Sequence, residues 1–117
     1  MQKERTFRLV DRMILADSFG KRLKGLLGTE ALPEDTGLLL KPCRQIHTWW
    51  MKYPIDVLYL DSQGNVLHID PEVPPNKWKK PVTDAAMVLE VNAGLCRKKN
   101  VEIGQKIDFL MRKEGKA

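Results

Sequence analysis

The stretch that decides the fold is Pro42–Asp61, which reads PCRQIHTWWMKYPIDVLYLD. Its residues before Pro54 are rich in β-branched and aromatic side chains, which favour strands, and a proline keeps the residue before it extended. After Pro54 comes the apolar run IDVLYL. We therefore predict two strands joined by a turn. The first covers residues 45–50, with its odd-numbered side chains on one face and its even-numbered side chains on the other.

The same stretch spaces a cysteine, a histidine and a methionine by four residues, at Cys43, His47 and Met51. Together these side chains suit copper or zinc. On a helix this spacing brings neighbours within about 5–6 Å, but on a strand it separates them by roughly 13 Å. Because we predict a strand, we expect no metal site, no cofactor and no catalytic Cys43–His47 pair. A pair of Cys96 with either histidine stays open beside its alternative, a small buried thiol.

The chain has 117 residues, of which 43% are hydrophobic and 30% are charged. This length and composition predict one globular domain over 1–117, with a core at about 7–111 and a basic tail at 112–117. No apolar run approaches the roughly 20 residues of a membrane-spanning helix, and the opening segment MQKERTFRLV lacks the apolar region of a signal peptide. We therefore expect a cytoplasmic protein without membrane association, in which the two cysteines are reduced.

Basic residues give the chain a formal net charge of +5, and they gather near its two ends and at Lys77, Lys79 and Lys80. Such a surface attracts phosphates or an acidic partner, or it simply keeps the protein in solution. The sequence shows no motif in which basic and aromatic residues alternate, and no base-stacking platform. We therefore do not expect nucleic acid as a partner beyond a weak, electrostatic attraction.

The remaining segments predict a mainly antiparallel α+β domain. Residues 17–28 have the apolar spacing of a short amphipathic helix, and residues 93–99 can form another short helix. Short strands are expected at 7–16, 36–40, 45–50, 55–61, 65–70, 87–92 and 105–111. Asp61–Gly64 predicts a hairpin turn, and the proline-rich segment 71–81 predicts an exposed excursion outside the sheet. We expect about six to seven of these short strands to form one compact, barrel-like rolled sheet, with the amphipathic helix on its flank.

Asp56 stands out because it lies between two apolar residues in a run that otherwise reads as buried. A carboxylate in such a place has to be hydrogen-bonded or paired. One interpretation is that it caps backbone amides in the turn around Pro54. The other is that it acts as an acceptor in a pocket that also holds His47 or Lys52.

The segment WWMKYPIDVLYLDSQGNVLHI resembles the motif centre of the DUF192 family, also grouped as uncharacterised protein family 0127. Three further stretches follow the order of that family: a helix ending in GLLG, then TGLLL, then VLEVNAG with VEIGQKIDF. The resemblance covers about residues 7–111, and the chain departs from the commoner pattern in PCRQIHT and at Leu27. The matching positions are Arg22, Gly25, Leu26, Trp50, Met51, Lys52, Pro54, Asp56, Asp61, Gly64, Glu90, Ala93, Gly94 and Gly104.

The resemblance implies a compact, barrel-like, mainly antiparallel domain with a short helix, and it implies no established activity. It also favours Trp50 as the packed member of the adjacent tryptophans, which leaves Trp49 exposed. Our hypothesis is a non-enzymatic module that binds a protein or a small-molecule ligand, with no catalytic residue assigned. The alternatives are a hydrolase-like enzyme with Asp56 or His47 as general base, and weak nucleic-acid binding. The candidate binding residues lie in and around the stretch Trp49–Asp56: His47, Trp49, Met51, Lys52 and Asp56.

Overall fold

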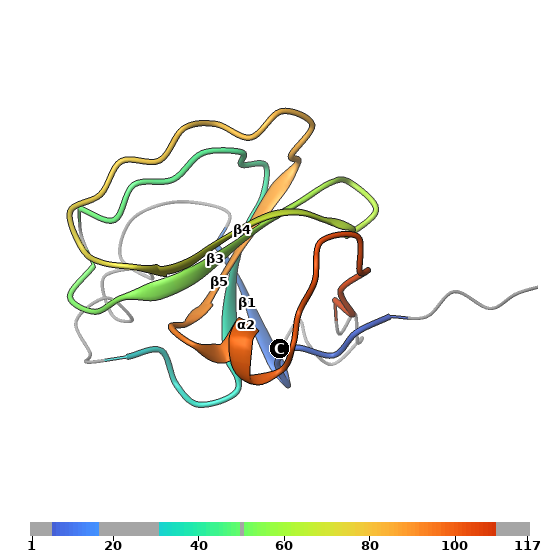
Figure 1. The fold of residues 1–117 in the computed structure, drawn as a ribbon, viewed down its shortest axis with the longest axis horizontal. Helices are drawn as coiled ribbons and strands as arrows, with labels where there is room; N and C mark the ends of the chain where they lie inside the picture. Colours follow the sequence, from blue (N-terminus) through green and yellow to red (C-terminus); the bar gives the residue numbers. More distant parts are fainter. Residues whose placement is uncertain (1–5, 17–30, 50, 110–117) are drawn as a thin grey trace, which may run out of the picture.

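The computed structural model describes residues 6–16, 31–49 and 51–109. Within these residues lie the strands β1 (Arg12–Ala16), β2 (Thr36–Leu40), β3 (Ile55–Leu60), β4 (Val66–Val73) and β5 (Met87–Asn92), and the helix α2 (Leu95–Lys98). The strands form one sheet in the order β1-β2-β5-β3-β4, in which only β1 and β2 are parallel. The predicted mainly antiparallel α+β fold is confirmed. Because β1 and β4 are the two edges of an open five-stranded sheet, the predicted barrel-like closure is not confirmed (Figure 1).

The inner strands of the sheet are buried on both faces. Every residue of β2 and β3 is buried, and in β5 only the last residue is partly exposed. Because side chains alternate along a strand, each inner strand feeds two apolar clusters, one on each face. The loop-side core takes Leu38, Leu40, Ile55, Val57, Tyr59 and Val88, and the helix-side core takes Leu39, Leu58, Leu60, Met87, Leu89 and Val91.

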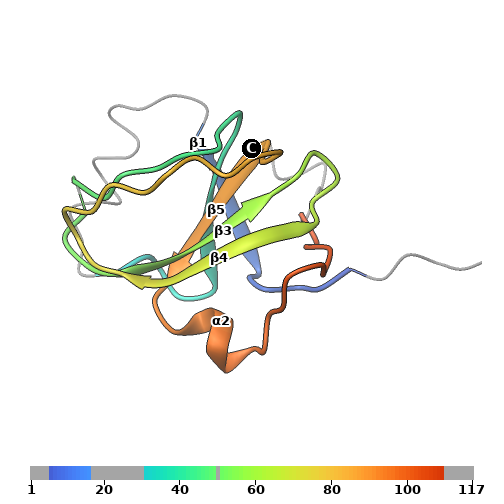
Figure 2. The ribbon, with the colours of Figure 1, turned by 45° about the horizontal axis from the view of Figure 1, so that its top comes forward.

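Different segments cover the two faces. In Figures 1 and 2, the segment that follows β2 and the segment that precedes β5 run side by side on one side of the sheet, and α2 lies on the other. The loop-side cover contributes Ile46, Met51, Tyr53 and Val82, whereas the helix-side cover contributes Leu9, Val10, Cys96 and Ile107. Since the sheet faces are closed in this way, chemistry has to be sought in the covering segments and along the sheet edges.

The hairpin predicted at Asp61–Gly64 is confirmed, and its cause is local. Asp61 Oδ1 accepts hydrogen bonds from the backbone amides of Gln63 and Asn65, each at 2.9 Å. Gly64 has a φ of 90°, which a residue with a side chain rarely adopts. A Cβ at Gly64 would also come within 2.6 Å of the Phe109 ring. Both the backbone conformation and the packing therefore require glycine at this position.

Three sequence predictions need correction. Between residues 45 and 49 no strand forms; the only pairing in that described segment is an isolated bridge between His47 and Trp78. The partner segment contains Pro74, Pro75 and Pro81, and proline cannot donate to a continuous ladder. Within the described part of 105–111, only Lys106 and Ile107 form bridges. The alternation of side chains nevertheless holds through residue 49.

The third correction concerns the proline-rich excursion, whose first three residues belong to β4. Pro71 fits there because β4 is an edge strand, where a missing N–H removes no ladder bond. Glu72 has a φ of 49°, and the pairing with β3 shifts register between Ile55 and Val57, which marks a bulge. The helix predicted at 17–28 and the packing of Trp50 lie outside the described residues, and α2 confirms the helix predicted after Ala93.

Candidate functional site

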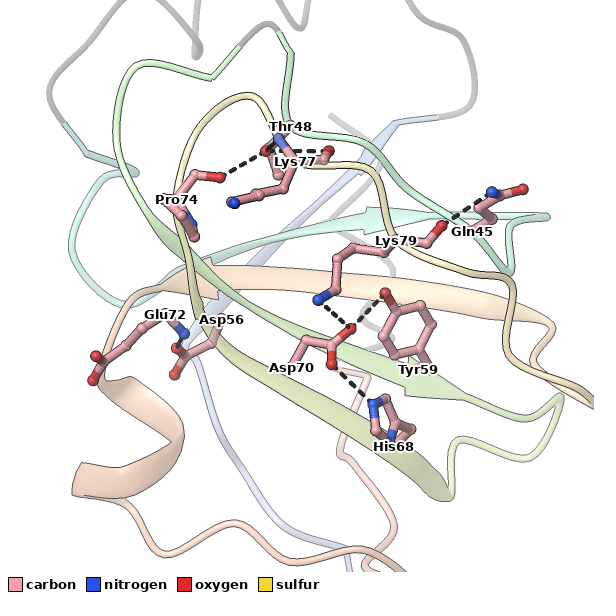
Figure 3. A network of polar contacts seen from close by, with 10 residues as sticks. All are labelled: Gln45, Thr48, Asp56, Tyr59, His68, Asp70, Glu72, Pro74, Lys77 and Lys79. Atoms are coloured by element: carbon pink, nitrogen blue, oxygen red, sulfur yellow. Dashed lines mark hydrogen bonds and ion pairs between the residues drawn. The ribbon is translucent and has the colours of Figure 1, made fainter.

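Residues 41–54 and 74–83, here called the loop pair, are held together at Thr48. This side chain is only 1% exposed. Its hydroxyl donates to the carbonyl of Pro74 at 2.7 Å and accepts from the amide of Lys77 at 2.7 Å. The amide of Thr48 also donates to the carbonyl of Lys77 at 2.8 Å. One buried threonine therefore fixes the position of the second segment against the first, as Figure 3 shows.

Further bonds continue this contact along the loop pair. The Gln45 side-chain amide donates to the carbonyl of Lys79 at 3.0 Å, and the amide of Lys79 donates to the carbonyl of Ile46 at 3.2 Å. The amide of Val82 donates to the carbonyl of Arg44 at 2.9 Å. The two loops thus behave as an irregular antiparallel pair, and their outward side chains are held in fixed relation to one another.

The outward side chains form a cluster of three rings, here called the aromatic platform: His47, Trp49 and Trp78. The ring centroids are 4.7 Å apart for His47 and Trp49, 6.1 Å for His47 and Trp78, and 5.6 Å for the two tryptophans. The rings of His47 and Trp78 are nearly parallel, at 7°. Trp49 is 54% exposed and Trp78 is 60% exposed. Large aromatic residues are rarely so exposed unless they meet a partner.

The remaining sequence-predicted residues of this stretch lie around the platform or beneath it. Lys52 is exposed, whereas Met51 is buried in the loop-side core, against which Cys43 also packs. His47 instead points outward to the tryptophans. Cys43, His47 and Met51 are therefore not brought together. Among the described residues, no group of three or more His, Cys, Asp or Glu side chains is placed to hold a metal ion.

Asp56 is buried completely, and its carboxylate binds backbone amides. It accepts from the amide of Glu72 at 2.8 Å, from Gly94 at 3.1 Å to each oxygen, and from Cys96 at 2.9 Å. The capping interpretation is thus correct in kind, but the amides belong to the β4 bulge and to the start of α2 rather than to the turn around Pro54. Asp56 ties two distant segments to the central strand β3.

Neither thiol has the features of a nucleophile. Burial raises the pKa of Cys43, whose thiol donates to the carbonyl of Gln45 at 3.1 Å. Burial, together with the nearby Asp56 carboxylate, raises the pKa of Cys96 to about 12. Both thiols therefore stay protonated at neutral pH, which fits the interpretation of Cys96 as a small buried side chain.

A second group of polar side chains converges on Asp70 at the β4 edge of the sheet (Figure 3). The Tyr59 hydroxyl donates to Asp70 Oδ2 at 3.0 Å, His68 Nε2 lies 2.9 Å from Asp70 Oδ1, and Lys79 Nζ lies 3.9 Å from Oδ2. An open groove of about 600 Å³ passes over this group and is lined by Leu67, His68, Asp70, Lys80, Pro81 and Thr83, among others. The pKa of Tyr59 is raised well above its usual range by burial and by the Asp70 carboxylate, so the phenol remains a donor.

Glu90, in the middle of β5, is a buried carboxyl group of another kind. Its side chain is 6% exposed, and it makes no hydrogen bond with any other described residue. Burial raises its pKa from 4.5 to about 7. Glu90 therefore changes its charge near neutral pH while Asp56, one strand away, binds three amides.

The model of the DUF192 family, described as "Uncharacterized ACR", matches residues 2–109. The chain belongs to the DUF192 family. A UPF0127 protein of the archaeon Thermococcus sibiricus is 32% identical over 114 residues, which are 91% of this chain and 71% of that protein.

Two crystal structures share the fold of this chain. A protein of unknown function from Novosphingobium aromaticivorans matches with a TM-score of 0.69 at 22% identity, over 82% of this chain and 73% of that one. A Sinorhizobium meliloti protein provisionally described as a transcription regulator matches with a TM-score of 0.65 at 24% identity, over 80% and 78% of the two chains. Among the described residues, no helix has the length and apolarity needed to cross a membrane.

Several motif positions through which the chain resembles DUF192 have structural roles in this fold. Asp56 binds amides, Asp61 and Gly64 shape the hairpin, and Gly94 adopts a φ of 91° before α2. The aromatic platform depends instead on Thr48 and Trp78, which sequence reasoning did not single out. The signal for Trp78 was a tryptophan inside a segment of prolines and lysines, where no core-forming periodicity explains an aromatic ring.

Proposed function

We propose that this chain is a non-enzymatic binding module and that the aromatic platform is its contact surface. The observation that carries the proposal is the exposure of Trp49 and Trp78, at 54% and 60%, on two loops that are held together by hydrogen bonds to the buried Thr48 hydroxyl. Rigid, exposed aromatic rings supply a large contact area at little cost in conformational entropy, and tryptophan is enriched at the energetic centres of interfaces.

The residues assigned from the sequence divide into two roles in this proposal. His47 and Trp49 make contact with the partner, and the exposed Lys52 supplies a charge near them in the sequence. Met51 and Asp56 act from beneath, because both are buried and Asp56 uses its carboxylate on backbone amides. Asp56 is thereby removed from the role of general base, since no substrate reaches a fully buried carboxylate.

The experiment is a titration of the purified full chain, followed by tryptophan fluorescence and by the thermal unfolding midpoint. The probes are oligonucleotides, acidic peptides, proline-rich peptides and oligosaccharides. We expect at least one class to bind, and that binding to weaken in Trp49→Ala and in Trp78→Ala while both variants keep the far-UV circular dichroism of the parent. Binding that is unchanged in both variants would overturn the proposal.

A second candidate function, general acid–base catalysis, is favoured by the groove over Asp70. There the His68–Asp70 pair has the hydrogen-bonded geometry of an oriented base, and His68 is half-exposed. The test is hydrolysis of p-nitrophenyl acetate and p-nitrophenyl phosphate from about pH 5 to about pH 8. A rate above buffer that disappears in His68→Gln supports this candidate. A rate that His68→Gln leaves unchanged rejects it.

A further inference from the structure

The two segments of the loop pair are basic and contain no acidic residue. Residues 41–54 and 74–83 contain six of the 20 Lys and Arg residues and none of the 15 Asp and Glu residues. The other residues, with fourteen basic and fifteen acidic side chains, then have a formal charge of −1, against +5 for the whole chain. The two segments are separated in sequence, and the fold brings them together through backbone hydrogen bonds.

Most of this charge is available to a partner. Lys79 faces Asp70, at 3.9 Å. The other basic residues of the loop pair are exposed and form no ion pair within the described part of the chain: Lys41, Arg44, Lys52, Lys77 and Lys80. The acidic residues that flank the loop pair in sequence are Asp56, which is buried, and Glu72 and Asp84, which are exposed.

We propose that the aromatic platform of the loop pair binds single-stranded nucleic acid. This inference rests on the proposed function and names its partner. Bases stack on the exposed faces of Trp49 and Trp78, and the exposed ammonium and guanidinium groups of the loop pair contact the phosphates. The combination of stacking rings with a basic groove or rim is the arrangement by which proteins bind single strands without reading their sequence.

The observations favour a single strand over other polyanions. In a duplex the base faces are covered by their neighbours, so exposed rings gain nothing from it. An acidic peptide matches the charge but offers no flat faces to the three rings. An anionic membrane is contacted by aliphatic as well as aromatic side chains, and the exposed large aliphatic residues in the described part of the chain, Leu15 and Ile103, lie outside the loop pair. The expectation against nucleic acid drawn from the sequence assumed that no stacking platform accompanies the charge, and the pairing of His47, Trp49 and Trp78 alters that premise.

The experiment measures fluorescence anisotropy of labelled single strands of about 12 nucleotides, a length within the usual site size, with the full chain as titrant. Oligo(dT), oligo(U) and a mixed DNA strand are compared with the matching duplex. We expect the single strands to bind with similar affinity to one another and more tightly than the duplex. Trp49→Ala and Trp78→Ala should each weaken binding by roughly 5- to 150-fold, the loss of one stacked base, and Trp49→Phe should restore most of it.

The contribution of the basic residues is tested by the dependence of Kd on salt concentration. Between about 50 mM and about 200 mM salt, log Kd should rise linearly with log salt. The slope should shrink by about 0.7 for each phosphate that Lys77→Gln or Lys80→Gln leaves without its cation. Lys98→Gln is the matched control, because Lys98 is an exposed lysine on α2, on the other side of the sheet. It should leave both the affinity and the slope unchanged.

The outcomes separate this inference from the proposed function. If an oligoglutamate peptide or anionic vesicles bind through the tryptophans and single strands do not, the inference is overturned and the platform keeps its role as a contact surface. If single strands bind but neither tryptophan variant changes their affinity, the inference is overturned as well. If no probe depends on the tryptophans, both proposals fail. Tight duplex binding that equals single-strand binding would also contradict the inference.

Discussion

The two halves of Pro42–Asp61 differ in how their side chains are buried. From Ile55 to Leu60 every residue is buried, the polar Asp56 included, and the polar group is satisfied by backbone amides. From Gln45 to Trp49 burial alternates, and a large aromatic ring is left exposed. The half with the buried carboxylate, which first suggests chemistry, stabilises the fold. In the other half Thr48 holds the two loops together, but the exposed ring of Trp49 has no comparable structural task, and it is there that a partner can be accommodated.

The largest effect is expected from Asp56→Ala. The substitution removes the buried carboxylate that accepts from the amides of Glu72, Gly94 and Cys96. At about 1.5–3 kcal/mol for each hydrogen bond to a charged group, partly offset by relaxation, we expect a loss of roughly 4–6 kcal/mol in the free energy of unfolding. Urea denaturation followed by circular dichroism measures it. A loss below about 1 kcal/mol would contradict the structural role of this half of the stretch, because Asp56 would then be free for another role.

A smaller effect is expected from Glu90, which sharpens the contrast between two buried carboxyl groups. Burial raises its pKa from 4.5 to about 7, so the folded state binds a proton that the unfolded state releases between these values. Stability from this group is therefore present at low pH and is lost as the pH rises from about 4.5 to about 7, by about 3 kcal/mol at about 1.4 kcal/mol per pH unit.

Glu90→Gln tests this pH dependence, because glutamine cannot ionise. Relative to the parent chain, the variant should gain about 3 kcal/mol in the free energy of unfolding between about pH 5 and about pH 8. Denaturation curves at several pH values measure the difference. Parallel pH profiles of the two proteins would contradict this expectation, because they would show that the pKa of Glu90 is not raised in the folded state.

Thr48→Val is expected to act on the loop pair alone. Valine has the same shape but leaves the amide of Lys77 and the carbonyl of Pro74 without their bonds. We expect a loss of about 2 kcal/mol, within the roughly 1–3 kcal/mol of a buried unsatisfied group, and a weaker near-UV circular dichroism of the tryptophans. Thr83→Val is the control, since Thr83 is exposed and should change neither quantity. Equal spectra for both variants would mean that Thr48 does not hold the platform.

The sequence was sufficient for the parts of this fold that local rules decide. Short apolar runs between turn-forming residues predicted β2, β3, β4 and β5, and the residues Asp61–Gly64 predicted the turn between two of them. The burial of Asp56 was also readable, because an acidic residue inside an apolar run needs partners. Which partners it finds was not readable, since Gly94 and Cys96 are about 40 residues away and meet it only through the order of the strands.

The platform was hidden from sequence reasoning for the same reason. His47 and Trp78 are paired by an isolated bridge between two segments that have no regular periodicity. The strand predicted at 45–50 failed because its partner contains prolines, a property of the partner rather than of the segment itself. Local patterns thus predicted the core, and the candidate site depends on which loops the core brings together.

The central claim is that the aromatic platform lies on the fold without supporting it, and the most direct test is the free energy of unfolding of Trp49→Ala by urea denaturation. The substitution removes two ring contacts of a half-exposed side chain, with His47 and with Trp78, so we expect a decrease of less than about 3 kcal/mol, twice the upper value of about 1.5 kcal/mol for one aromatic pair. A decrease of about 3–5 kcal/mol, as for a buried aromatic residue, would show that Trp49 belongs to the core and would contradict the account.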